Sequence, residues 1–93
     1  MTSTALYQKA RDLDALADDV ETSIDIAWGV ARSPEWECSN ADDVRDALEQ
    51  WRNAARSSAR NLREEASRVR GEATRAFQRE EDAREDARAN PPR

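Results

Sequence analysis

The sequence predicts an all-α fold in which two long helices form an antiparallel hairpin. Three observations lead to this prediction. Apolar residues recur at alternating intervals of four and three residues, as they do along a packed helix. Only two glycines and three prolines interrupt the 93 residues. One short segment, RSPEWECSN, separates the two periodic stretches, so the chain is expected to turn back there.

The first helix is predicted over residues of about 3–32. Thr2 or Ser3 can cap its start by accepting a backbone N–H, and Pro34 stops the helix because it lacks an N–H group. Between them runs a coiled-coil-type stripe, here called the seam. Its members follow a strict repeat of four and three: Leu6, Ala10, Leu13, Ala17, Val20, Ile24, Ala27 and Ala31.

The turn is predicted at about 33–39 and the second helix at about 40–86. Asp42 and Asp43 lie where the dipole at a helix start favours negative charge. The predicted stripe of this helix is Val44, Leu48, Trp51, Ala55, Ser58, Leu62, Ala66, Val69, Ala73 and Phe77. Beyond Phe77 no large apolar residue follows. We therefore expect one hairpin domain over residues 1–86 and a disordered tail over 87–93.

In this hairpin, Trp51 is expected to pack against the Val20–Ile24 region, while Trp28 and Trp36 close the turn end. Two helices shield each other on one side only. Pairing with a second hairpin would cover the remaining apolar side chains and give a four-helix bundle. The expected partner is a second copy of the chain or a sister helical hairpin.

Composition limits the function. Leu, Ile, Val and Phe number twelve, enough for a narrow stripe but not for a large globular core. The single Cys38 and the absence of histidine exclude an intrachain disulfide and a Cys/His zinc site. An elongated hairpin offers no concave site, so neither a catalytic residue nor a cofactor is expected. No apolar run suits a cleaved signal peptide or a membrane span, which predicts synthesis in the cytoplasm.

Charge is distributed unevenly along the chain. Residues 1–39 carry three basic and eight acidic side chains, whereas residues 52–79 carry eight arginines and three glutamates. An acidic first helix folded back on a basic second helix would be electrostatically matched. Arg52, Arg56, Arg60 and Arg63 share one helical face and raise the alternative of nucleic-acid binding. The overall charge of −5 and the lack of aromatic residues among these arginines argue against it.

Three features together resemble a known family. Trp36 lies in the turn, the apolar Trp51 follows fifteen residues later, and a Phe77-Q-R-E-Glu81 sequence lies about forty residues past the turn. This arrangement, over about Leu6–Glu81, resembles the WXG (ESAT-like) substrates of type VII (ESX) secretion systems. Here Cys38 occupies the position of the motif glycine, and Phe77 that of the tyrosine in the C-terminal export signal. The composition, rich in Arg and Ala, is also typical of actinobacterial proteins.

The resemblance implies a non-catalytic protein of paired hairpins that leaves the cell without a cleaved signal peptide. It further implies that Phe77 and Glu81 dock on a secretion ATPase and that Trp36 and Cys38 form the turn motif. Alternatives remain for each residue: Trp36 simply fills the hairpin end, Phe77 is the last seam residue, and Cys38 is a free thiol. For the whole chain, the alternative is a cytosolic coiled-coil adaptor or a phage-encoded structural protein.

Overall fold

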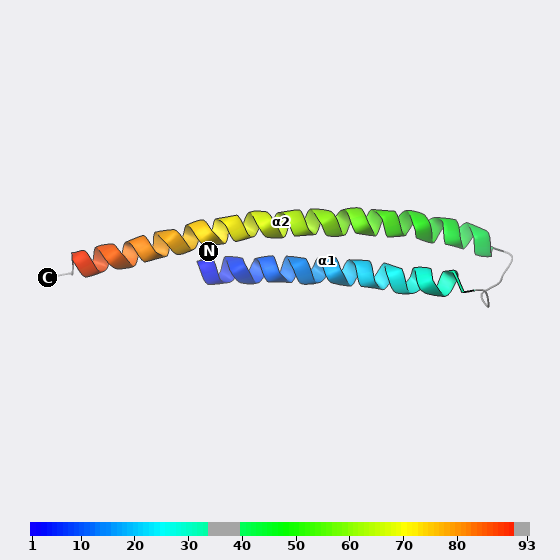
Figure 1. Cartoon of the computed structure of the whole chain (residues 1–93), viewed down its shortest axis with the longest axis horizontal. Coiled ribbons are helices and arrows are strands. Elements are labelled where there is room, and N and C mark those ends of the chain that lie inside the picture. The colour runs from blue at the N-terminus through cyan, green and yellow to red at the C-terminus, as the bar shows by residue number, and fades with distance from the viewer. Residues whose placement is uncertain (34–39, 91–93) are drawn as a thin grey trace.

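The computed structural model describes residues 1–33 and 40–90, and it confirms the predicted all-α hairpin. Helix α1 spans Ser3–Ala31 and helix α2 spans Ala41–Ala89; the described residues form no strand. The two helices lie side by side and antiparallel, and α2 continues past the first residue of α1 (Figure 1). The molecule is a rod measuring 81 × 17 × 14 Å.

Both ends of α1 have a clear chemical cause. The Thr2 hydroxyl accepts a hydrogen bond from the Ala5 backbone N–H at 3.2 Å, which satisfies one of the free donors of the first turn. At the other end, the Arg32 N–H donates to the Trp28 carbonyl at 3.0 Å. The Ser33 N–H donates to the Val30 carbonyl at 3.1 Å, which tightens the last turn before Pro34.

Helix α2 starts after Asn40, whose side chain makes no capping hydrogen bond. Asp42 and Asp43 in the first turn supply the favourable negative charge instead. At the far end, α2 continues to Ala89, three residues beyond the predicted end at residue 86. The first part of the tail that we predicted to be disordered is therefore helical.

The seam predicted for α1 is confirmed, because each of its eight members is buried or half-buried. On α2, the seam repeats every four and three residues without a break. Its members are Ala41, Arg45, Leu48, Arg52, Ala55, Ala59, Leu62, Ala66, Val69, Ala73, Ala76 and Glu80. The apolar core is concentrated in the half far from the turn, where Leu6 and Ala10 pack with Ala66, Val69 and Ala73.

The stripe predicted for α2 was wrong at four positions. Val44, Trp51 and Phe77 are 38%, 62% and 48% exposed, and Ser58 is also exposed. The predicted stripe contains two successive four-residue steps at Leu62 and again at Ala73, so it changes helical register twice. A straight helix can bury only one register against its neighbour. The heptad register of residues 62–73 extends unchanged toward the turn. Arg52 therefore lies in the seam, and Trp51 lies beside it.

Candidate functional site

The two flanks of the seam differ sharply in chemistry. In the usual heptad notation, seam residues occupy positions a and d, the e positions of both helices meet along one flank, and the g positions meet along the other. We call the first the ion-paired flank and the second the apolar flank. Each is built from both helices and runs along the rod.

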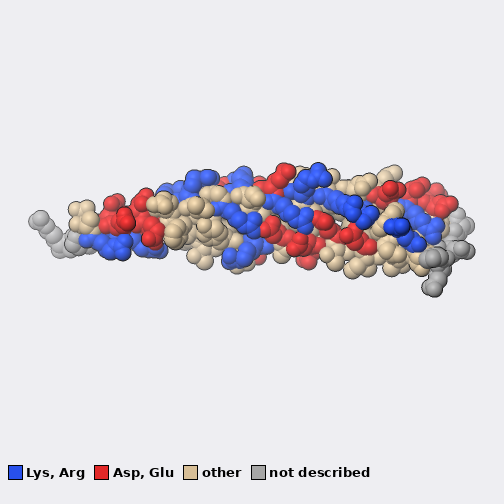
Figure 2. Space-filling model, in the orientation of Figure 1, with Lys and Arg blue, Asp and Glu red and all other residues tan. Residues whose placement is uncertain are grey.

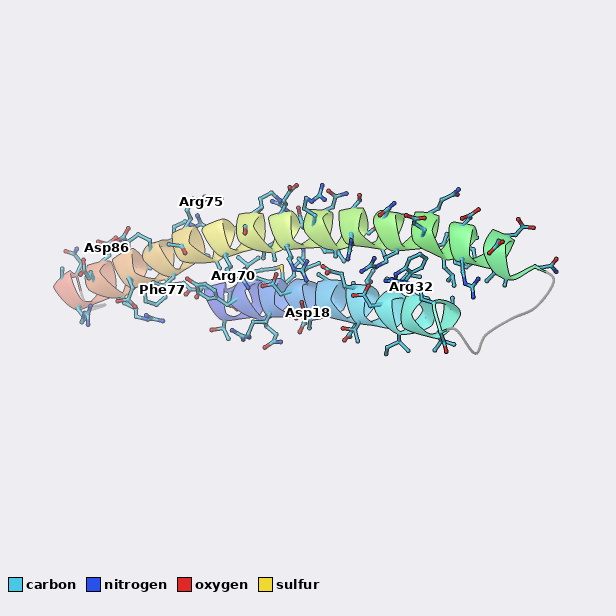
Figure 3. The ribbon with its side chains drawn as sticks, turned by 45° about the vertical axis from the view of Figure 1, so that its right-hand side comes forward. Asp18, Arg32, Arg70, Arg75, Phe77 and Asp86 are labelled. Carbon is cyan, nitrogen blue, oxygen red and sulfur yellow. The ribbon has the colours of Figure 1, made fainter. Side chains whose placement is uncertain are left out.

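Ion pairs between the helices line the first flank. Arg70 contacts Asp14, and Arg63 contacts both Glu21 and Asp18, the latter at 2.8 Å. Figure 3 shows Arg70 reaching from α2 into the space between the helices. Hydrogen bonds from Arg63, first to Asp18 and then to Glu21, raise the pKa of this guanidinium above its ordinary value. These contacts pair acidic side chains of α1 with basic side chains of α2, as the charge distribution predicted.

Trp28 closes the turn half of the same flank, as its predicted position near the turn suggested. The guanidinium carbons of Arg32 and Arg52 lie 5.7 and 5.6 Å from the centre of its ring, within the range of cation–π attraction. Arg52 also donates to Asp25 at 3.0 Å. Among the described residues, the Trp28 indole N–H is the buried side-chain donor that lacks a hydrogen-bond partner.

Large apolar side chains gather on the opposite, apolar flank near the turn. They occupy g positions and the neighbouring c positions and are largely exposed: Leu16 (49%), Ile26 (64%), Val30 (59%), Val44 (38%) and Trp51 (62%). A shallow hollow of about 430 Å³ on α1 is lined by Asp19, Val20, Ser23 and Ile24. Isolated exposed apolar residues are ordinary in proteins, whereas a cluster of this kind indicates a contact surface.

The apolar flank carries little charge in this half. Its g and c positions hold only one charged residue over residues 16–30, Asp19, and none over residues 44–58. Arg45, Arg52 and Arg56 lie on the seam or on the ion-paired flank. Farther from the turn the same flank becomes ionic. There the pKa of Glu65 is lowered, first by its hydrogen bond with Arg68 and also by the charge of Lys9 across the seam.

The predicted C-terminal motif lies at the open end of the hairpin. The Glu80 carboxylate accepts hydrogen bonds from the Ser3 N–H at 2.9 Å and the Ser3 hydroxyl at 2.5 Å, which fixes where α1 begins beside α2. Phe77 is half-exposed just before this level, and Glu81 follows one turn later and pairs with Arg84. Figure 3 shows Phe77 near the start of α1, and α2 runs on alone to Asp86 and beyond.

The arginine face proposed from the sequence does not form a continuous basic surface. Arg52 and Arg63 are paired with acids of α1. Arg56 and Arg60 line a hollow of about 420 Å³ that also contains the carboxylates of Glu21 and Glu64. Figure 2 shows acidic and basic side chains interspersed along the visible face of the rod.

The remaining seam residues named from the sequence lie where they were expected. Leu6, Leu13, Val20, Ile24, Leu48, Leu62 and Val69 all occupy seam positions and are buried or half-buried. Trp36 and Cys38 lie outside the described residues. Sequence reasoning missed Tyr7, which packs on the core and shares a 3.2 Å hydrogen bond with Thr74 across the helices. Its place directly after Leu6, at an e position, could have indicated this contact.

Two structural absences concern residues 1–33 and 40–90. No group of three or more Cys, Asp or Glu side chains in these ranges is arranged to hold a metal ion. Neither helix contains a stretch that is apolar and long enough to span a membrane. Comparison with known proteins gives no match among protein-family models, curated proteins or solved structures.

Proposed function

We propose that this chain is a non-catalytic, WXG-like protein of a type VII (ESX) secretion system, which acts through helix–helix pairing and a C-terminal docking signal. The observation that carries the proposal is the position of Phe77 and Glu81. They lie four residues apart on α2, at the open end of a helical hairpin, and Phe77 is 48% exposed. An aromatic ring and a carboxylate one turn apart can be read together by a receptor.

The pairing part of the proposal rests on the apolar flank. Its five large side chains would be covered if the hairpin packed against further helices, completing a four-helix bundle. The partner is a second copy or a sister hairpin, and a secretion ATPase is the proposed receptor for the Phe77–Glu81 signal. The protein would be made in the cytoplasm and exported without cleavage of a signal peptide.

An export assay tests this proposal. Phe77→Ala and Glu81→Ala should each abolish the appearance of the protein in culture filtrate of a strain that carries a type VII system. The hairpin should stay folded, because Phe77 is half-exposed and the ion pair of Glu81 is with Arg84 of the same helix. Helical circular dichroism and intracellular protein level are the checks on folding.

Glu85→Ala is the matched control, since Glu85 is exposed on the next turn of the same helix. Secretion of this variant should equal that of the unaltered protein. If the unaltered protein stays inside the cell, or if the Phe77 and Glu81 variants are secreted normally, the export proposal is wrong.

The apolar flank favours a second candidate function, a cytosolic coiled-coil adaptor that is never exported. In that case Phe77→Ala and Glu81→Ala should change nothing, whereas Trp51→Asp should break partner binding without unfolding the hairpin. Nucleic-acid binding is not favoured, because the arginines that suggested it face carboxylates.

A further inference from the structure

We infer that residues 20–30 of α1, here called the strand-patterned segment, pair with the same segment of a second copy as antiparallel β-strands when the turn half of the hairpin opens. The inference goes beyond the proposed function, because it concerns neither export nor the pairing of folded hairpins. It assigns the chain a site of self-association that is hidden while α1 is helical.

The strand-patterned segment alternates residue types as a β-strand does. Every second residue is β-branched or aromatic: Val20, Thr22, Ile24, Ile26, Trp28 and Val30. These types favour strands, and alternation places all of them on one face of a strand. Elsewhere in the sequence, no more than two such residues follow one another at this spacing. The segment contains no proline and only Glu21 and Asp25 as charged residues, which is typical of segments that form cross-β assemblies.

A helix cannot bury this pattern. A step of two residues rotates a helix by about 200°, so alternate side chains point to opposite sides of it. Ile24 is half-buried in the seam and Trp28 lies on the ion-paired flank. Ile26 and Val30 lie on the other side and are 64% and 59% exposed. In an extended strand these four side chains would share one face, where the side chains of a paired strand would contact them.

The helix is also intrinsically weak over these residues. Valine, isoleucine and threonine lose side-chain freedom in a helix, which lowers their helix propensity. Gly29 lies in the helix interior, where glycine is unfavourable relative to alanine. A Cβ added to Gly29 would lie more than 4 Å from α2, so close packing does not require glycine there.

Contacts with α2 hold the segment less firmly than they hold the start of α1. The core cluster of buried side chains lies in the other half of the hairpin, around Leu6 and Val69. Near the turn the α2 seam contains Arg45 and Arg52. Arg52 pairs with Asp25 at 3.0 Å, but the Asp25 side chain is 49% exposed, and ion pairs open to water contribute little to stability. The turn half should therefore open before the half that contains the core.

The charges of the segment select an antiparallel arrangement. With Ile26 opposite Ile26 of the second copy, Ile24 lies opposite Trp28, an aromatic and β-branched pair. On the other face Asp25 lies opposite Ala27, so the aspartates of the two copies do not meet. A parallel pair in register would instead set Asp25 beside Asp25 and Glu21 beside Glu21, and like charges in neighbouring strands are destabilising.

Partial unfolding of the full-length chain tests the inference. At the midpoint of its thermal unfolding, the protein should form assemblies that bind thioflavin T, show the infrared spectrum of antiparallel sheet and diffract at about 4.7 Å. Protease digestion followed by mass spectrometry should identify residues 20–30 as the protected part. Each variant is incubated at its own midpoint, so that the unfolded fractions are equal and differences report strand pairing.

A matched pair of lysine substitutions locates the contact. Ile26→Lys places two lysines opposite each other at the centre of the paired strands and should abolish assembly. The helix should tolerate it, because Ile26 is 64% exposed and lysine is a good helix former. Leu16→Lys makes a similar change at an exposed position outside the segment and should leave assembly unchanged. Both change the net charge of −5 equally, so charge cannot explain a difference.

Gly29→Ala separates helix stability from strand pairing. Alanine strengthens the helix and leaves the alternating pattern intact. This variant should assemble more slowly than the unaltered protein at the midpoint of the unaltered protein, and equally fast at its own midpoint. Circular dichroism before heating shows that each variant starts as a folded hairpin.

Several results would overturn the inference. The chain could stay free of β-sheet throughout its unfolding transition, or Ile26→Lys could assemble as the unaltered protein does. Equal loss of assembly with Leu16→Lys, a parallel sheet, or a protected part outside residues 20–30 would contradict it as well. Phe77 and Glu81 lie outside the segment, so failure here and failure of export are distinguishable.

Discussion

Val69 is the largest side chain that the described part of the hairpin buries completely. The other completely buried residues of its cluster are alanines: Ala10, Ala66 and Ala73. Alanine favours helix and allows two helices to approach closely, but each one removes little apolar area from water. At the residue scale, stability therefore depends on the few larger seam side chains.

A matched pair of substitutions tests this dependence. Val69→Ala should lower the free energy of unfolding by about 2 kcal/mol, because it removes two buried methyl groups and leaves a cavity. Val44→Ala makes the same change on the exposed flank and should alter stability by less than about 0.5 kcal/mol. Both gain the same helix propensity, so the difference reports burial. Urea denaturation gives both values, and equal losses would place Val44 in the core.

At the element scale, the sequence was sufficient for the two helices, their antiparallel pairing and the whole seam of α1. The regular repeat from Leu6 to Ala31 admits only one buried face. Helix α2 was harder because its apolar residues change register at Leu62, and periodicity alone cannot say which half determines the packing. The far half does, since Val69 and its neighbours pack against Leu6.

The candidate surfaces were predictable to a smaller extent. The charge match between the helices followed from composition, and the Phe77–Glu81 pair followed from spacing. The exposure of Trp51 could not be predicted in the same way, because a tryptophan in an apolar stripe is usually buried. Its position outside the seam depends on the register of residues more than two turns away, which no local pattern contains.

The contact between the start of α1 and α2 predicts a pH dependence. Hydrogen bonds from the Ser3 hydroxyl and N–H hold the pKa of Glu80 below its ordinary value of 4.5. A lowered pKa in the folded state means that this contact contributes fully above pH 4.5 and is lost as pH falls through the folded-state pKa. Glu80→Gln should therefore destabilise the hairpin at pH 7, and the difference from the unaltered protein should narrow below pH 4.5.

Thermal unfolding at several pH values measures this effect. Glu64→Gln is the control, because Glu64 is exposed and makes none of the inter-helix hydrogen bonds described above. Its difference from the unaltered protein should not change over the same range. A Glu80 variant that behaves like the Glu64 variant would show that the Ser3 contact does not contribute to stability.

At the scale of the whole molecule, the hairpin is a rod whose Cα radius of gyration is 22.2 Å. A compact globule of this length would have a value of about 12 Å, and an unfolded chain one of about 30 Å. Small-angle scattering of the purified chain should therefore give an intermediate value. A result near either extreme would contradict the hairpin.

Binding along the apolar flank should add mass without adding length. A complex with a helical partner should keep a radius of gyration close to that of the free rod while its cross-section increases. An end-to-end complex would nearly double the length instead. Scattering combined with light scattering for the mass separates these arrangements.

The part of α2 that extends past Ser3 has a separate consequence for recognition. From Glu81 to Ala89 no other helix lies beside α2 (Figure 1), and this stretch has its own backbone hydrogen bonds and short-range pairs such as Arg84–Glu81. Opening this stretch would break no seam contact, so its local unfolding is energetically independent of the rest of the rod. A receptor could therefore bind, bend or unwind the last turns of α2 while the paired part of the hairpin stays folded.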